Sequence, residues 1–317
     1  MGVPLSLLNL MKGRGRPHLI ENGEEYFVKK AGVIFFVFII SCFYNLSPLE
    51  AGDAVQIEPP KVRIIASPGE SQAGQIKALN NSPYPRKVKV YASDWKYLQA
   101  QDGSKDFLPP STLESSAVKW ITFYPAEFTI PPYGKTSVSY TVRLPQDARG
   151  GHYAVLFFEN YLSDQTKVSQ EEGVSVNLAV RTASLFYVEA KGYSERKAVI
   201  NNLKFKKEND KFYLNAVFTN SGDLDITAKS DFYIIDDKGM IYARGDFNDI
   251  YTLPQDVAVL EGYWKEKIPA GKYDLVMTID IGVALKELQL GEIPAITKEA
   301  QIEIGETGEV VKAGELK

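Results

Sequence analysis

The chain has 317 residues, of which 44% are apolar and 24% are charged, so it is long and apolar enough to build hydrophobic cores. Its 36 lysines and arginines stand against 40 aspartates and glutamates, a formal net charge of −4, and the basic residues are scattered along the chain. This excludes the clustered basic surface that nucleic-acid binding requires, so we expect no nucleic-acid partner. The 18 tyrosines and 16 phenylalanines, together with many short alternating stretches, favour sheet over helix.

Residues 1–51 are predicted to be a leader. Lys29 and Lys30 precede an apolar run that starts at Ala31, which is the order found in a secretory signal peptide. The run extends at most to Leu46, or 16 residues, whereas a membrane-spanning helix needs roughly 20. We therefore expect an exported protein of the bacterial periplasm or cell envelope, which contacts a membrane only through this leader or a lipid anchor.

Two interpretations of the end of the leader remain open. Cleavage after Ala51, in Leu49-Glu50-Ala51, would release a soluble protein. Alternatively, Ile39-Ile40-Ser41-Cys42 fits the aliphatic, small, cysteine pattern of bacterial lipoproteins, and the only cysteine of the chain, Cys42, would then carry lipid. We favour soluble export, because any cysteine that ends an apolar run mimics this motif.

Residues 52–60, with Pro59-Pro60, are predicted to be a linker, and 61–189 a first β-domain. The clearest strand of this domain is Ser137–Leu144, in which every second residue is apolar. Such alternation is typical of a strand with one buried and one exposed face. The residues of the expected buried face are Val138, Tyr140, Val142 and Leu144.

Residues 190–304 are predicted to be a second β-domain, followed by a frayed polar tail over 305–317. The same alternation recurs in this half of the chain. It is clearest in two runs, one of Phe212, Leu214, Ala216 and Phe218 and one of Tyr273, Leu275, Met277, Ile279 and Ile281.

Two local signatures occur once in each half. Asn81-Ser82 and Asn220-Ser221 each end a predicted strand, and Gly151-His152-Tyr153 and Gly271-Lys272-Tyr273 each open one. The Gly-x-Tyr placement is typical of the corner where a tyrosine hydroxyl caps nearby backbone in immunoglobulin-like sandwiches. We therefore predict an all-β protein of two tandem immunoglobulin-like β-sandwich domains after the N-terminal signal or anchor segment.

The chemistry of an enzyme is not apparent in the sequence. His152 is the only histidine beyond the leader, and we expect it to be a turn residue that faces solvent. No cysteine follows Cys42, so the usual zinc and copper ligands are missing from this part of the sequence. Gly134-Lys135-Thr136 resembles the end of a phosphate-binding loop, but Thr129 stands where that motif needs a glycine. We therefore expect no catalytic residue, no metal and no cofactor.

Residues 61–188 resemble the N-terminal domain of the PapD-like periplasmic pilus-assembly chaperones. The resemblance rests on the order and spacing of several short motifs rather than on any one of them. They are Val62-Arg63-Ile64-Ile65, Val88-Lys89-Val90-Tyr91, Tyr124-Pro125-Ala126-Glu127-Phe128, Leu144-Pro145-Gln146-Asp147 and Leu185-Phe186-Tyr187.

The resemblance implies that the partner is an exported subunit with an incomplete β-sandwich. Such a chaperone adds a strand to the subunit, so that backbone hydrogen bonds pair the edge and alternate apolar side chains complete the core. Here the inserted face would be Val174, Val176, Leu178 and Val180. The alternative is that these four residues pack inside their own sandwich.

The family also binds the terminal carboxylate of the subunit through two basic residues. Arg63 matches the first by motif, and the alternative for Arg63 is a solvated arginine on an edge strand. Ser184 stands where the family has the second basic residue, and Arg181 lies three positions too early, on the opposite face of the strand.

Two functions remain open from the sequence. The first is a periplasmic chaperone-like protein that binds exported subunits by β-strand addition, in pilus or surface-structure assembly. The second is a non-catalytic surface or cell-envelope protein, structural or adhesive, built from immunoglobulin-like domains, since this fold carries many functions. A retained lipid on Cys42 would favour the second.

Overall fold

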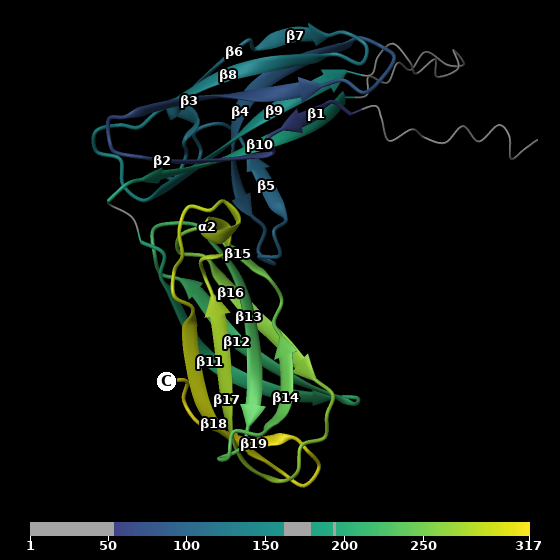
Figure 1. Cartoon of the computed structure of the whole chain (residues 1–317), viewed down its shortest axis with the longest axis vertical. Coiled ribbons are helices and arrows are strands. Elements are labelled where there is room, and N and C mark those ends of the chain that lie inside the picture. Colours follow the sequence, from purple (N-terminus) through teal and green to yellow (C-terminus); the bar gives the residue numbers. More distant parts are fainter. Residues whose placement is uncertain (1–53, 162–178, 193–194) are drawn as a thin grey trace, which may run out of the picture. The chain divides into compact units, whose positions relative to one another are not determined.

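The computed structural model describes residues 54–161, 179–192 and 195–317 of the chain (Figure 1). The leader, with Cys42 and both cleavage positions, lies outside these residues. Almost every element is a β-strand, and the strands form four sheets that pair into two tandem sandwiches. The predicted fold class is thereby confirmed. No helix among the described residues is long and apolar enough to cross a membrane.

The first sandwich, purple to teal in Figure 1, contains two sheets and one short 3-10 helix, η1 (Val118–Trp120). The first sheet has the strand order β1 (Gln56–Glu58), β3 (Ser71–Leu79), β8 (Lys135–Arg143), β6 (Ile121–Tyr124). The second sheet has the order β2 (Lys61–Ala66), β10 (Ala179–Ala190), β9 (Gly151–Tyr161), β4 (Arg86–Tyr97), β5 (Lys105–Leu108), and β7 (Glu127–Ile130) also pairs with β4.

The core of this sandwich comes from alternate residues of both sheets, as the sequence predicts. Val138 and Val142 of β8 are fully buried, and Tyr140 between them packs edge-on against Phe186 of β10. β9, which lies inside its sheet between β10 and β4, is buried along nearly its whole length.

The second sandwich, green to yellow in Figure 1, also has two sheets. The three-stranded sheet has the order β11 (Ala198–Glu208), β12 (Lys211–Asn220), β16 (Val257–Trp264). The other has the order β14 (Ile241–Asp246), β13 (Ile226–Ile235), β17 (Gly271–Asp280), β18 (Ile296–Ile304), β19 (Val310–Ala313), and β15 (Ile250–Thr252) also pairs with β13. A short helix, α2 (Val283–Glu287), follows β17.

The alternating runs of this half form its core. Phe212, Leu214, Ala216 and Phe218 are all buried in one apolar cluster with Tyr273, Leu275, Met277, Ile279 and Ile281. Trp264 of β16 stacks on Phe212 in the same cluster, with the ring centroids 5.3 Å apart. Two facing sheets therefore bury one another's apolar side chains, as a sandwich requires.

An asparagine turn recurs at the same place in both sandwiches. The Oδ1 of Asn80 accepts the backbone N–H of Ser82 at 3.0 Å, and its Nδ2 donates to the carbonyl of Tyr84 at 2.7 Å. Asn220 makes the same two bonds. Its Oδ1 accepts the backbone N–H of Gly222 at 3.1 Å, and its Nδ2 donates to the carbonyl of Leu224 at 2.9 Å. The repeated signature thus corresponds to Asn80, not to Asn81, because only the side chain of Asn80 closes the turn.

Within the described residues, the tyrosine corner is formed in the second sandwich and not in the first. The hydroxyl of Tyr273 donates to the backbone carbonyl of Pro269 at 2.9 Å. The buried hydroxyl of Tyr153 has no hydrogen-bond partner among the described residues. Its ring instead packs edge-on against Trp95 and Tyr187, 5.8 Å away in each case.

Three predictions are corrected by the strand pairing and the burial. The predicted linker 52–60 is wrong for Gln56–Glu58, because these residues form β1 on the edge of β3 and Val55 and Ile57 enter the core. The predicted tail 305–317 is wrong for Val310–Ala313, which pair with β18 as β19. His152 lies inside β9, half-buried, and not at a solvent-facing turn.

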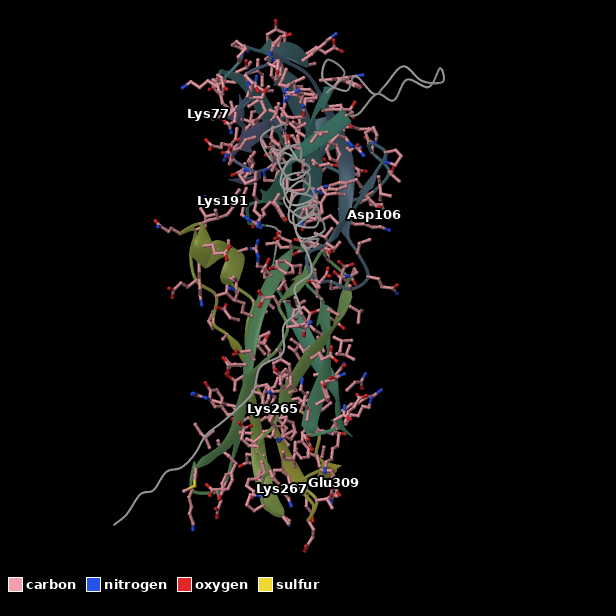
Figure 2. All side chains as sticks on the ribbon, turned by 90° about the vertical axis from the view of Figure 1, so that its right-hand side faces the viewer. Lys77, Asp106, Lys191, Lys265, Lys267 and Glu309 are labelled. Carbon is pink, nitrogen blue, oxygen red and sulfur yellow. The ribbon has the colours of Figure 1, made fainter. Side chains whose placement is uncertain are left out.

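Charged side chains cover the outer faces without forming a basic surface. The exposed lysines Lys77, Lys191, Lys265 and Lys267 lie at separate places on the described part of the chain (Figure 2). This distribution agrees with the scattered charge of the sequence.

Two carboxylates stand directly opposite one another on β13 and β14, Asp231 against Asp246. Burial, together with the nearby charge of Asp246, raises the pKa of Asp231 above its ordinary value of 3.8. The folded state therefore binds this proton more tightly than the unfolded state does. This tighter binding of the proton at Asp231 stabilises the folded state below pH 3.8, and the stabilisation is lost as the pH rises through the raised pKa.

We predict that Asp231→Asn stabilises the protein at pH 7, by about 0.2–1 kcal/mol, since it removes a like-charge cross-strand pair. Urea unfolding at pH 7 and pH 3 measures the effect, and the gain should shrink at pH 3, where the carboxyl group is protonated. Asp237→Asn, in the exposed turn before β14, is the control and should change little at either pH. Equal effects of the two substitutions at pH 7 would contradict the prediction.

Candidate functional site

β10 is paired along its full length on one side and along half of its length on the other. β9 pairs with Ala179–Glu189 in antiparallel register. On the opposite side, β2 runs parallel to β10 and pairs only with Leu185–Ala190. In the part of the chain that the structure describes, no strand pairs with residues 179–184 on that side. The first half of β10 is therefore an open sheet edge (Figure 1).

The register fixes which backbone groups point to this open edge. The N–H of Leu185 points toward β2, where it donates to the carbonyl of Pro60 at 3.0 Å. Because alternate residues of a strand direct their backbone groups to opposite sides, Arg181 and Ala183 also direct theirs away from β9. These groups are free to pair with an added strand, as unpaired edges do.

The side chains of this segment divide between two faces. Phe186 and Val188 of β10 lie in the core of the first sandwich, so Val180, Thr182 and Ser184 share that inner face. Val180 is half-buried opposite Asn160 of β9. Val174, Val176 and Leu178, the other three residues of the expected inserted face, lie outside the described residues. Insertion of this face into a partner stays a prediction.

Ser184 and Arg181 lie on opposite faces of β10, as the sequence predicts. Ser184 is buried, and its hydroxyl donates to the backbone carbonyl of Pro59 at 2.8 Å. Arg181 is exposed on the outer face, where its guanidinium contacts the Tyr91 hydroxyl at 3.4 Å and lies 5.3 Å from the Phe157 ring centroid. Ser184 supplies no charge for a partner carboxylate, and Arg181 faces away from it.

Arg63 is fully enclosed, so the alternative of a solvated edge arginine is wrong. It lies on β2 beside Tyr187 of β10, and its side chain is 1% exposed. Its two terminal nitrogens bind both oxygens of Asp225, from Nη1 to Oδ1 at 2.9 Å and from Nη2 to Oδ2 at 2.6 Å. Nη1 also donates to Glu189. Asp225 immediately precedes β13, so this contact joins the two sandwiches, which belong to the compact unit Gly52–Lys317.

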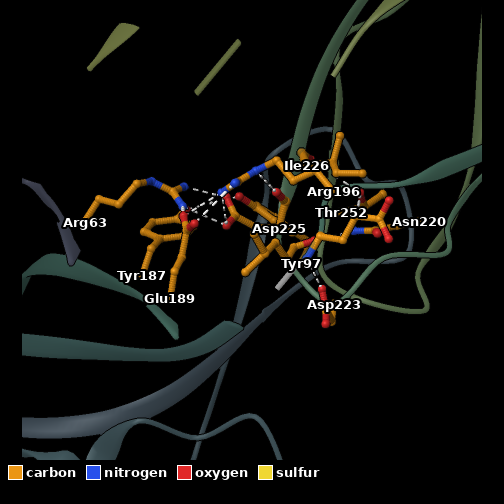
Figure 3. Close-up of polar contacts among 12 residues, drawn as sticks. Arg63, Tyr97, Tyr187, Glu189, Arg196, Asn220, Asp223, Asp225, Ile226 and Thr252 are labelled. Atoms are coloured by element: carbon orange, nitrogen blue, oxygen red, sulfur yellow. Dashed lines mark hydrogen bonds and ion pairs between the residues drawn. The ribbon is translucent and has the colours of Figure 1, made fainter. Parts of the chain in front are cut away.

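Arg196 completes the cluster from the segment before β11. Its Nη2 donates to Glu189 Oε1 at 2.5 Å, and its Nε donates to the backbone carbonyl of Asp225 at 3.1 Å. Figure 3 shows the two guanidinium groups reaching the same pair of carboxylates. We call Arg63, Glu189, Arg196 and Asp225 the ion cluster. Its four side chains are at most 5% exposed, and its charges balance.

The ion cluster lies against an aromatic surface. The Arg63 guanidinium is 4.8 Å from the centroid of the Tyr187 ring, and the Tyr187 hydroxyl meets that of Tyr97 at 3.1 Å. Tyr97 and Tyr187 belong to an apolar cluster that also contains Leu253 of the second sandwich. These rings exclude water from the charges, which strengthens each ion pair.

The environment keeps Arg63 charged. Burial lowers the pKa of its guanidinium, but the carboxylates of Asp225 and Glu189 more than offset this, and the pKa lies above its ordinary value. Burial also raises the pKa of the Tyr187 hydroxyl, and the nearby Tyr97 hydroxyl and Asp225 carboxylate raise this pKa further. Arg63 is thus a permanent cation whose binding capacity is taken up by carboxylates of its own chain. Binding of a partner carboxylate to Arg63 stays a prediction.

Sequence reasoning missed the other three residues of the ion cluster. Glu189 entered it only as the end of the predicted first domain, and no role was predicted for Arg196 or Asp225. One available signal was Asp225, a charged residue between the turn at Asn220 and the apolar Ile226. The described residues hold no group of three or more histidine, cysteine, aspartate or glutamate side chains suited to a metal ion.

No family model matches the chain, and no curated protein matches it. Among solved structures, the chain is similar to the class 5 fimbriae chaperone CfaA, with 12% identity and a TM-score of 0.43 over 78% of this chain and 98% of that chain. The chain is also similar to the Pseudomonas aeruginosa chaperone CupB2, with 12% identity and a TM-score of 0.38 over 77% of this chain and 98% of that chain. Its similarity to the E. coli chaperone DraB has 12% identity and a TM-score of 0.36, over 83% of this chain and 98% of that chain. These similarities concern the fold alone, and TM-scores below 0.5 carry no information on function.

We predict that Arg63→Ala lowers the free energy of unfolding by about 3–5 kcal/mol, because it leaves two buried carboxylates facing one arginine. The double variant Arg63→Met/Asp225→Leu keeps Arg196 paired with Glu189 and should lose less than the single variant. Urea unfolding measures both, with Lys77→Ala on the exposed face of β3 as the control. A single variant as stable as the control would show that the ion cluster adds nothing to stability.

Proposed function

We propose that this chain is a periplasmic chaperone-like protein that binds exported subunits by β-strand addition, in the assembly of pili or another surface structure. The observation that carries the proposal is the open edge of β10 over Ala179–Ser184. An edge strand that is held firmly on one side and left unpaired on the other is the arrangement that strand addition uses.

The rest of β10 supports this role by holding the edge in place. Leu185–Ala190 is clamped between β9 and β2, and Phe186 and Val188 anchor it in the core. The open half therefore projects from a rigid strand, so little conformational entropy is lost when a partner pairs with it. A subunit that lacks one strand would gain the backbone bonds of Arg181 and Ala183, together with the apolar side chain of Val180.

In this mechanism, Arg63 binds a subunit carboxylate only if that carboxylate replaces one that Arg63 already binds. A subunit carboxylate that binds Arg63 would take the place of Asp225, which now holds both terminal nitrogens of the guanidinium. Such an exchange keeps the charge balanced at Arg63 and releases Asp225 from the first sandwich. Carboxylate capture is thus proposed to cost the ion pair between Arg63 and Asp225, whereas pairing with Arg181 and Ala183 breaks no strand ladder within the described residues.

Ala183→Pro tests the edge directly. The substitution removes an N–H that points to the open side, and no bond within the sandwich is lost, as for prolines on edge strands. We predict a nearly unchanged melting temperature and a loss of exported partners in pull-downs from the periplasm of a Gram-negative host. Ala183→Val, which keeps the N–H, is the matched control and should retain the partners.

Two outcomes would reject this mechanism. If Ala183→Pro recovers as many partners as Ala183→Val does, the open edge is not the binding site. If it melts so early that unfolding accounts for the loss, the edge carries the fold and not the partner. Either result leaves the structural or adhesive surface protein as the better hypothesis.

The cellular location is tested by the N-terminus of the exported protein and by lipid labelling at Cys42. We predict that the protein expressed in a Gram-negative host leaves the cytoplasm and begins at Gly52, after cleavage behind Ala51. N-terminal sequencing of the exported form measures this. Lipid labelling that disappears in Cys42→Ala would contradict soluble export and favour the surface protein.

A further inference from the structure

A groove of about 540 Å³ lies on the outer face of the first sandwich, on the sheet that does not contain β10. It crosses β3, β8 and β6, which lie side by side in Figure 1, and η1 forms one of its walls. Its polar and aromatic lining consists of Ser71, Lys119, Trp120, Thr122, Thr141 and Arg143. A groove of this volume has the size of an ordinary small-molecule site.

The strand register places four of these side chains on one face. Ser71 pairs with Arg143, and Thr122 pairs with Thr141. Residues directly opposite in an antiparallel pair share a face, and so do residues two apart in a strand. Val142, between Thr141 and Arg143, points the other way and is fully buried in the core. The four polar side chains therefore face solvent together.

The groove carries two positive charges with nothing to balance them. Lys119 and Arg143 are both exposed, and neither forms an ion pair within the residues that the structure describes. None of the described lining residues is acidic. A ligand must therefore bring its own negative charge, and a planar carboxylate suits the guanidinium fork of Arg143.

Trp120 gives the groove a rigid aromatic wall. Its ring packs partly against the core, and it lies 4.0 Å, centroid to centroid, from the imidazole of His152 on β9. Burial lowers the pKa of His152, although the hydrogen bond between its Nε2 and the Arg149 carbonyl opposes this, so the neutral form of the ring is favoured. The indole offers a flat apolar surface, of the kind that stacks on the apolar face of a ring.

Hydroxyl groups continue along the sheet beyond the groove. Ser137 and Ser139 follow on the same face of β8, and Tyr124, opposite Ser139 on β6, is 80% exposed. β8, which runs under the middle of this surface, is paired on both sides, with β3 and with β6, so its backbone groups are used within the sheet. An added peptide strand has no backbone partner on such a sheet face, whereas a sugar chain binds through hydroxyl groups, charge and ring stacking alone.

We propose that this groove binds an acidic glycan, a sugar chain that carries carboxylate groups. Arg143 and Lys119 bind the carboxylate, Ser71, Thr122 and Thr141 bind sugar hydroxyls, and Trp120 stacks on a sugar ring. The groove does not include the open edge of β10, so this proposal can be tested separately from the proposed function. It gives the protein a contact with an anionic polysaccharide of its surroundings.

Isothermal titration calorimetry of the exported chain tests the proposal with three probes. They are a hexamer of galacturonic acid, the same hexamer with its carboxyl groups reduced, and a hexamer of glutamate. We expect binding of the acidic sugar at least about tenfold tighter than of the reduced sugar, since charge-assisted hydrogen bonds are the strong ones. The glutamate peptide should bind no better than the reduced sugar.

Matched variants assign the binding to the groove. Arg143→Gln and Lys119→Gln remove exposed charges and should each weaken binding of the acidic hexamer about tenfold, with unchanged melting temperatures. Lys77→Gln removes an exposed lysine from the same sheet, outside the groove, and should leave binding unchanged.

Three results would overturn the proposal. The wild type fails to bind the acidic hexamer, the glutamate peptide binds as tightly as the sugar, or Lys77→Gln weakens binding as much as Arg143→Gln does. The second result would mean that the groove attracts any anion through its charge alone, and the third that binding follows the charge of the whole surface and is not located in the groove.

Discussion

Arg63, Glu189, Arg196 and Asp225 bring together two positive and two negative charges on side chains that are at most 5% exposed. An isolated charge in such a place costs several kcal/mol, and only close pairing offsets this cost. Each of the four side chains therefore depends on an oppositely charged partner from the cluster. Because they come from β2, from β10, from the segment before β11 and from the residue before β13, all four charges are paired only when the two sandwiches are in contact.

The aromatic cluster beside these charges makes the requirement stricter. Trp95 donates its indole N–H to the carbonyl of Ala154 and packs against Tyr97 and Tyr187, while Tyr97 also contacts Tyr251 of β15. Apolar burial supplies most of the free energy at such a contact, and the ions supply its specificity.

Much of the fold could be predicted from local pattern. Val138, Val142 and the run Phe212–Phe218 are buried as their alternation indicates, because a period of two determines which face a residue takes. β1 was missed since its alternation covers only Gln56–Glu58, too short to separate from a linker. The tail prediction failed for the same reason, because β19 is four residues long and depends on β18 for its pairing.

The candidate site was harder to predict than the fold. The sequence placed Val180 on a strand and Arg181 on the face opposite Ser184, since both follow from the chain itself. It could not show that β2 stops pairing at Leu185, which sets the limit of the open edge. Nor could it bring Asp225 to Arg63, 162 residues away, because no local pattern encodes such a meeting. The groove beside Trp120 likewise depends on β3 lying beside β8, a strand that comes much later in the sequence.

The three tryptophans happen to lie in three different environments. Trp95 is enclosed by tyrosines at the contact between the sandwiches, Trp264 is stacked in the core of the second, and Trp120 lines the groove of the first. Indole emission depends on the polarity around the ring, so each residue has its own spectrum. With the other two replaced by phenylalanine, each single-tryptophan protein becomes an optical reporter for one region. Loosening of the contact between the sandwiches, melting of the second core and occupation of the groove can then be followed as separate signals in the same molecule.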